Sequence, residues 1–331
     1  MKKINTRDEV LAILKSSGTY VSGEAISSSL GLSRAAVNGS VKALRSDGCV
    51  IDSVTNKGYK LEYCPDKLLT GDVWSYLPSE RRSSVICLQS VDSTSNRLKE
   101  MLKDNIPSGT CIIANEQTGG RGRLGRRFES PSGTGLYLSI LLRPSGAISD
   151  MSEITAWTAV AVRNAILTSF GIETSIKWVN DLFIGSRKVC GILTELSVEG
   201  EIGLVSNVIV GIGINVNQDL TDFPRELSGI ASSLSLESGG KKLDRAKLAA
   251  AVILEMDKLV SDWPAERSSY LETYRANCIT LGREVTVSNY ATGAKKQGKA
   301  IALNDDFSLN VHYCDGSEAD VMSGEVSVKF E

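Results

Sequence analysis

The sequence predicts an α+β protein whose helices and strands are grouped along the chain into three parts. The first part contains a helix, two short helices joined at Gly31 and a β-hairpin. Three strand-like segments between residues 175 and 215 have connections too short for crossover helices, which predicts a mixed, mainly antiparallel central sheet with helices around it. Alternating apolar and polar residues after residue 283 predict a small all-β end. We expect the parts to span residues 1–64, 65–278 and 279–331.

The composition is that of an ordinary globular chain, with 42% hydrophobic and 23% charged residues among 331. No apolar run approaches the ~20 residues of a membrane span, and the polar N-terminus does not resemble a secretory signal. We therefore expect a cytoplasmic protein without membrane contact. Seven cysteines without a C-x-x-C motif favour reduced, mostly buried thiols. His312 is the only histidine, which excludes histidine-based catalytic triads and most zinc sites.

Apolar residues at helical spacing mark the first part, over residues 9–15, 22–30 and 33–45. Ser22 and Ser33 are placed to cap the second and third helices. Gly31 turns the chain between them, which is the arrangement of a helix-turn-helix. A β-prone segment from Cys49 and a hairpin tip at residues 56–60 follow, and we interpret them as a wing.

The charge of the first part favours DNA binding. Residues 1–64 carry nine lysines and arginines against six aspartates and glutamates, a net charge of +3, whereas the whole chain carries −2. The alternative is a winged helix used only for packing or dimerisation. Gly39 costs the third helix roughly 1 kcal/mol relative to Ala, and its bare surface either allows close approach to DNA or weakens binding. The expected DNA-binding residues are Ser33, Arg34, Asn38, Lys42 and Lys57.

A glycine- and arginine-rich loop occupies residues 119–127. Gly120, Gly122 and Gly125 fit the dinucleotide-binding motif G-x-G-x-x-G, which is a weak signal on its own. Loop-forming residues 131–133 stand where that motif needs a helix, and Ile140 stands where it needs an acidic residue. Four arginines instead indicate a site for carboxylate or phosphate, unless the loop is only a solvated basic segment. They are Arg121, Arg123, Arg126 and Arg127.

Polar residues also gather where the predicted central strands end. Residues 92–96 follow a strand, and their hydroxyls either cap the next helix or bind a small polar ligand. Lys177 is as readily explained by a solvated sheet rim as by a site. Lys188 differs, because it lies across a tight turn from Asp181 and next to Gly191 and Gly185. A cation, a carboxylate and two glycines that admit backbone approach favour a binding site.

Taken together, these segments resemble the biotin–protein ligases, and specifically the bifunctional type that also represses the biotin operon. The resemblance covers essentially the full length. It is carried by the helix-turn-helix residues 33–38 and by five ordered motifs, at 120–126 (GRGRLGR), 177–181 (KWVND), 187–193 (RKVCGIL), 211–215 (GIGIN) and 323–327 (SGEVS).

The resemblance implies a winged helix-turn-helix, a ligase domain and an SH3-like β-barrel. It implies that biotin and ATP form biotinyl-5′-AMP, whose biotinyl group passes to a lysine of the biotin carboxyl carrier protein of acetyl-CoA carboxylase. Mg²⁺ would arrive with ATP, with no metal held by the protein alone. Operator DNA and a ligand-dependent homodimer are further implied partners. A carboxylate is already ionised at pH 7, so adenylate formation needs charge neutralisation rather than a general base.

The resemblance also implies residue roles. Lys188 and Arg121 neutralise the carboxylate and the α-phosphate, Asp181 lies near the reacting centre, and Phe128 belongs to a lid formed by residues 119–128. A second loop, at residues 217–230, covers the adenine. Ser95 departs from the family's S-T-N pattern. The residues that match positions contacting biotin or the adenylate are Ser93, Thr94, Ser95, Gln117, Arg121, Gly122, Arg123, Lys188 and Asn215.

Two other functions compete with this one. A non-enzymatic, small-molecule-sensing DNA-binding regulator would not need Lys188 or an intact arginine loop. A lipoate-type ligase uses a similar core, but the winged helix and the all-β end favour biotin.

Overall fold

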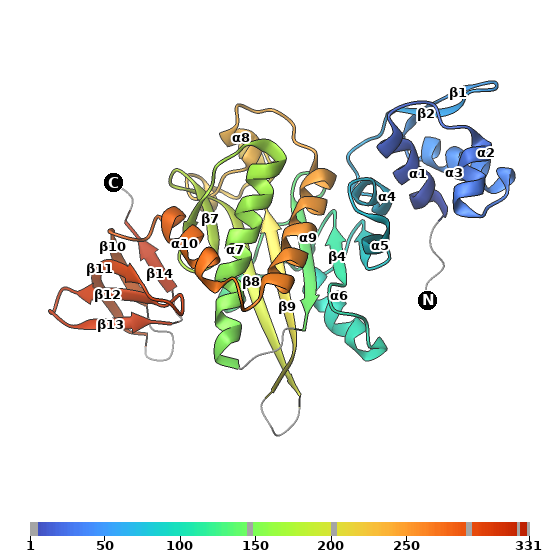
Figure 1. Ribbon diagram of the computed structural model, residues 1–331. Helices are drawn as coiled ribbons and strands as arrows, with labels where there is room; N and C mark the ends of the chain where they lie inside the picture. Colours follow the sequence, from blue (N-terminus) through green and yellow to red (C-terminus); the bar gives the residue numbers. More distant parts are fainter. Residues whose placement is uncertain (1–5, 144–147, 200–203, 289–292, 323–324, 330–331) are drawn as a thin grey trace.

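The computed structural model describes residues 6–143, 148–199, 204–288, 293–322 and 325–329. Figure 1 shows a helical group at the N-terminal end, a central sheet with helices, and a small sheet at the C-terminal end. The predicted α+β class and the order of these elements are confirmed. Within the described residues, no helix is long and apolar enough to cross a membrane.

The N-terminal group is the predicted winged helix-turn-helix. Ser22 and Ser33 accept hydrogen bonds from the backbone amides of Ala25 and Ala36, so both predicted N-caps are confirmed. Gly31 adopts the left-handed conformation that the turn requires, with φ of 64°. The elements are α1 (Thr6–Ser17), α2 (Gly23–Leu30), α3 (Arg34–Ser46), β1 (Val50–Val54) and β2 (Gly58–Tyr63).

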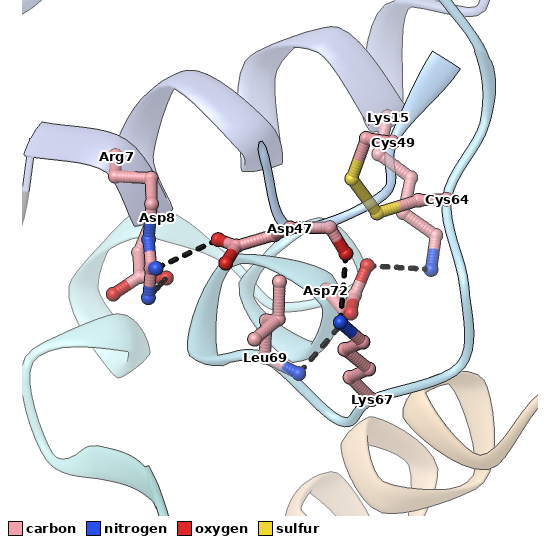
Figure 2. Close-up of a disulfide and its surroundings, with 9 residues drawn as sticks. All are labelled: Arg7, Asp8, Lys15, Asp47, Cys49, Cys64, Lys67, Leu69 and Asp72. Carbon is pink, nitrogen blue, oxygen red and sulfur yellow. Dashed lines mark hydrogen bonds and ion pairs between the residues drawn. A yellow bond between two sulfur atoms is a disulfide. The ribbon is translucent and has the colours of Figure 1, made fainter. Parts of the chain in front are cut away.

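The prediction that all seven cysteines are reduced is wrong for two of them. Cys49 and Cys64 form a disulfide at the base of the wing (Figure 2). The β1–β2 ladder pairs Val50 with Tyr63, and this brings the residues just outside it face to face. Spacing in the sequence gave no signal, because the pairing depends on the hairpin register. The remaining cysteines are free thiols.

The segment after the wing is fixed to the helical group rather than extended. Asp72 is buried and accepts from Lys15 Nζ at 3.2 Å and from the Leu69 amide at 3.1 Å (Figure 2). Lys67 Nζ donates to the Asp47 carbonyl at 2.8 Å. Two short helices that the sequence did not predict follow, α4 (Thr70–Trp74) and α5 (Ser79–Arg82).

The central sheet has seven strands in the order β3-β4-β5-β9-β8-β7-β6. Only β3 and β4 run parallel, so the mainly antiparallel sheet is confirmed. Strand β7 was not predicted, because its four residues lie between two polar clusters. The strands are β3 (Val85–Leu88), β4 (Cys111–Ala114), β5 (Leu136–Leu142), β6 (Ser175–Lys177), β7 (Asp181–Ile184), β8 (Arg187–Glu199) and β9 (Leu204–Ile214).

Helices cover both faces of this sheet. On one face the main core packs against α7 (Ile148–Phe170), α9 (Arg245–Asp262) and α10 (Arg267–Asn277), where Trp157 stacks on Tyr270 at 3.9 Å between ring centroids. On the other face Leu98 of α6 (Thr94–Met101) packs with Ile112 and Leu141. The short helix α8 (Leu234–Glu237) follows β9 along the chain. The sheet is thus packed against helices on both faces, and this packing fixes the strand ends that carry the polar side chains.

The C-terminal part is a five-stranded antiparallel sheet in the order β13-β12-β11-β10-β14, which confirms the predicted all-β end. Trp178 ties it to the central part by donating from Nε1 to the Phe307 carbonyl at 2.9 Å. Ser323 and Gly324 of the fifth motif lie outside the described residues. The strands are β10 (Glu284–Ser288), β11 (Lys295–Leu303), β12 (Leu309–Tyr313), β13 (Glu318–Val321) and β14 (Glu325–Val328).

Candidate active site and DNA-binding surface

A cavity of about 530 Å³ lies over the central sheet, chiefly on β5, β8 and β9. Val326 and Ser327 of β14 also line it, so the C-terminal sheet contributes to its wall. All the ligand-contacting and catalytic residues expected from the sequence line this one cavity. They are Ser93, Thr94, Ser95, Gln117, Arg121, Gly122, Arg123, Phe128, Asp181, Lys188 and Asn215.

One end of the cavity is a cluster of hydroxyls. Thr94 donates from its amide and its hydroxyl to Gln117 Oε1, at 2.9 and 3.0 Å. Ser139 Oγ lies 2.7 Å from Thr94 Oγ1 and 2.9 Å from Ser95 Oγ. The Ser93 side chain makes no capping hydrogen bond, so the capping interpretation of this segment is not supported. Sequence reasoning missed Ser139, although a serine inside an otherwise apolar strand was a usable signal.

A cation and a carboxylate meet next to this cluster. Lys188 Nζ lies 2.6 Å from Asp181 Oδ1 across the β7–β8 hairpin, as the sequence predicted. A Cβ at Gly191 would lie 3.1 Å from Lys188 Nζ, so glycine leaves room for the lysine. The Lys188 side chain is 31% exposed, which keeps its ammonium accessible from the cavity. The predicted pair of charges is therefore formed beside Gly191, whereas a Cβ at Gly185 would meet nothing within 4 Å.

The arginine loop closes back on itself as a short hairpin. The Gly122 amide donates to the Arg126 carbonyl at 2.7 Å, and the Phe128 amide donates to the Gly120 carbonyl at 3.0 Å. Arg123 donates from Nη1 to Asn180 Oδ1 at 3.1 Å, which holds the loop against the strand end. Residues 128–135, which the structure describes in full, lead from the loop to β5 without an α-helix, so the expectation against a dinucleotide-binding motif is confirmed.

The Phe128 ring of the loop packs against glycines of β8 and β9 in the cavity wall. A Cβ at Gly213 would lie 2.6 Å from two carbons of the Phe128 ring, and one at Gly191 would lie 3.4 Å from it. The ring meets Tyr137 edge to face, with centroids 6.4 Å apart. This contact gives a physical reason for glycine at the centre of the 211–215 motif.

The second predicted loop is anchored beside Lys188. The Lys188 amide donates to the Ile230 carbonyl at 2.8 Å, and its carbonyl accepts from the Ser232 amide at 2.9 Å. Asn215 donates from Nδ2 to the Ser232 carbonyl at 2.9 Å and accepts from Gln218 at 3.2 Å. The Asn215 amide is therefore committed to holding the loop, although the residue lines the cavity.

Two buried thiols on strands of the central sheet are not suited to thiolate chemistry. Burial raises the pKa of Cys111 to about 12 and raises that of Cys190 as well, so both thiols stay protonated at neutral pH. The Asn96 amide, which donates to Asp92 at 2.6 Å, holds the pKa of the Asp92 carboxyl below its usual range. Among the described residues, no group of three or more His, Cys, Asp or Glu side chains is arranged to hold a metal ion.

The expected DNA-binding residues lie on the exposed side of the winged helix. Arg34, Asn38 and Lys42 follow one another at intervals of four along α3, which places them on one exposed helix face. Lys57 is exposed on the wing and lies 6.0 Å from the Tyr20 ring centroid. The Ser33 hydroxyl is used by the N-cap. These side chains are of the types that contact phosphates and bases, and Arg34 is paired with Glu24 of α2.

Comparisons with known proteins find relatives for both the N-terminal and the central part of the chain. Residues 6–60 match a helix-turn-helix domain family, and residues 86–215 match the biotin/lipoate A/B protein ligase family. A bifunctional ligase/repressor BirA from Bacillus spizizenii is 39% identical over 302 residues, which covers 91% of this chain and 92% of the relative. The chain belongs to the bifunctional ligase/repressor family.

Other members and structures agree. The ligase/repressor BirA of Escherichia coli is 34% identical, over 99% of this chain and 98% of that protein. The structure of the biotin protein ligase from Aquifex aeolicus in complex with biotin and ATP superposes with a TM-score of 0.63 at 32% identity. The superposition covers 75% of this chain and 99% of the Aquifex chain. This ligase/repressor therefore joins an enzyme of the ligase class to a DNA-binding module.

Proposed function

We propose that this ligase/repressor joins biotin to a lysine of the biotin carboxyl carrier protein of acetyl-CoA carboxylase, through biotinyl-5′-AMP. The observation that carries the proposal is the Lys188–Asp181 pair, at 2.6 Å, inside a cavity that Arg121 and Arg123 also line. The structure of the Aquifex ligase in complex with biotin and ATP supports the choice of substrates.

In the first step the biotin carboxylate attacks the α-phosphorus of ATP. A carboxylate–phosphorus bond forms, and the bond to the bridging oxygen breaks as pyrophosphate leaves. The obstacle is the approach of two anions, so Lys188 and Arg121 act by neutralising charge at the carboxylate and the α-phosphate. Mg²⁺ bound with ATP would supply further charge neutralisation at the phosphates.

In the second step the amine of the carrier lysine attacks the carbonyl carbon of the mixed anhydride, and AMP leaves. Asp181 is the carboxylate beside Lys188 and is suited to orient that amine. Between the steps the anhydride must be kept from water. The arginine loop with Phe128, and the loop at residues 217–230, lie over the cavity and serve as the cover.

The test is transfer of labelled biotin to a carrier domain, with ATP and Mg²⁺, by the wild type and Lys188→Ala. We expect ready transfer by the wild type and a loss of at least about 100-fold in the variant, typical for removal of one charge-stabilising group. A variant that transfers normally contradicts the assignment of Lys188. A wild type that binds biotin without transferring it supports the sensor hypothesis, and incorporation of labelled lipoate instead supports the lipoate hypothesis.

We also infer that the adenylate favours a homodimer, which presents two winged helices to a two-fold operator. Arg34, Asn38, Lys42 and Lys57 are the side chains expected to reach DNA, and Ser33 orients α3 through its cap. Binding to DNA from the biotin operon should tighten with biotin and ATP, and Lys42→Ala should reduce its dependence on salt. Divisions near residues 64 and 278 and a cytoplasmic location remain predictions.

A further inference from the structure

Three consecutive residues at the start of α9 each bind a different part of the molecule. Leu243 exchanges two hydrogen bonds with the Asn217 side chain, both of 2.9 Å, at the base of the loop expected to cover the adenine. Asp244 accepts from the Tyr76 hydroxyl at 2.8 Å and lies 3.9 Å from Lys15 Nζ of α1. The start of α9 therefore touches both a ligand loop and the winged helix.

Arg245 is the third of these residues, and its side chain is fully buried. Its guanidinium donates from Nε to Asp66 Oδ2 and from Nη2 to the Asp66 carbonyl, both at 2.8 Å. It also donates to Asn115 Oδ1 at 3.0 Å and to the Gly135 carbonyl at 2.9 Å. A buried arginine is tolerated only when its charge is paired and its donors are used. Asp66, between the winged helix and the sheet, is thereby fixed to two segments of the central part.

The segments that contain Asn115 and Gly135 are hydrogen bonded to residues that line the cavity or adjoin it. Asn115 donates to Ser132 Oγ at 2.8 Å, and Ser132 lies two residues after Ser130, which accepts from Gln117 of the hydroxyl cluster at 3.1 Å. The backbone amide of Asn217 donates to the Thr134 carbonyl at 2.8 Å. Residues 130–135 thus lie between the Arg245 guanidinium, the cavity wall and the base of the second loop.

We propose that Asp66 and Arg245 are positioning residues. They couple occupation of the cavity to the linker of the DNA-binding domain, residues 64–69. A ligand that orders the arginine loop and the 217–230 loop fixes residues 130–135 and Asn217. Arg245 holds Asp66 to that segment, so the order extends to the linker. The inference rests on the proposed function, because the ligand used is biotin with ATP. By linkage, the linker must affect ligand binding by the same factor.

Hydrogen exchange of the full chain, with and without biotin, ATP and Mg²⁺, tests this coupling. In the wild type, ligand should slow exchange in peptides over residues 115–135 and over the linker, 64–69, the latter by about fivefold or more. In Asp66→Asn, the cavity peptides should still slow and the linker peptide should not. Asp257→Asn is the matched control, because Asp257 also lies on α9 and pairs with an arginine, Arg81, at 2.6 Å. It should behave as the wild type.

The outcomes separate the two proposals. Cavity peptides that do not respond in the wild type overturn the proposed function, and this inference with it. A linker that slows in Asp66→Asn as it does in the wild type overturns the coupling alone. Asp66→Glu restores a carboxylate and should restore part of the linker response, which a merely structural defect would not show. If Asp66→Asn does not fold, Arg245→Lys gives the same comparison, since it keeps the charge and loses the planar fork.

Discussion

Substitution of Gly213 by alanine probes how the lid closes. The added Cβ would lie 2.6 Å from Cε1 and Cζ of Phe128. Ordinary carbon–carbon contacts are about 3.5 to 4.0 Å, so the ring must retreat by about 1 Å. Overpacking of this size costs about 1 to 3 kcal/mol. Because Phe128 belongs to the lid, we expect that cost to oppose lid closure more than folding. It corresponds to roughly 5- to 150-fold weaker retention of the adenylate.

The assay compares kcat/KM for biotin transfer, the rate of adenylate release and Tm in Gly213→Ala and wild type. We expect lower kcat/KM, faster release and little change in Tm. The double variant Gly213→Ala/Phe128→Leu tests the cause, because a smaller side chain at 128 leaves room for the methyl group and should recover part of the loss. Wild-type kcat/KM and release rate in Gly213→Ala would refute the reasoning. A loss that Phe128→Leu does not relieve would place the effect elsewhere.

Three further predictions concern stability. Gly39→Ala in α3 meets nothing within 4 Å and should raise the free energy of unfolding by about 1 kcal/mol, measured by denaturant titration. Burial raises the pKa of Asp72, so the folded state holds the proton more tightly than the unfolded chain. The free energy of unfolding should therefore fall as pH rises above about 4. Urea titrations at several pH values measure this decrease, and Asp72→Asn should lack the contribution. Reductant should destabilise the wild type by about 3 kcal/mol, because the disulfide closes a loop with a sequence separation of 15. Thermal unfolding scans with and without reductant measure this effect, and Cys49→Ser/Cys64→Ser should show the same Tm in both.

The parts of the fold that sequence predicted are those fixed by local rules. The caps at Ser22 and Ser33 and the turn at Gly31 depend on neighbours within a few residues, and all three were predicted correctly. The antiparallel sheet followed from connection lengths alone. Strand β7 and helices α4 and α5 were missed, because four or five residues show too little periodicity to be recognised.

The site shows the same division. Motif residues such as Lys188 and Asp181 were found because a tight turn brings them together along the chain. Ser139 and Arg245 act through partners far away in sequence, with sequence separations of 44 from Ser95 to Ser139 and 179 from Asp66 to Arg245. The Cys49–Cys64 pair depends on a hairpin register. One sequence has no local signal for contacts of this kind.

The arrangement of the cavity gives a physical reason to favour biotin over lipoate. Gly211 of β9 lies against Ser95, whereas Gly213, two residues on, pairs with Gly191 and so lies beside Lys188. Gly211 and Gly213 are about 7 Å apart along the strand, so the hydroxyl cluster and the charged pair contact successive points of the cavity. A ligand that fits needs a hydrogen-bonding head, a short chain and a carboxylate. The ureido ring of biotin offers such donors and an acceptor to the hydroxyl cluster, whereas the dithiolane of lipoate offers no strong hydrogen-bonding group. A site that hydrogen bonds a substrate group discriminates against analogues that lack it.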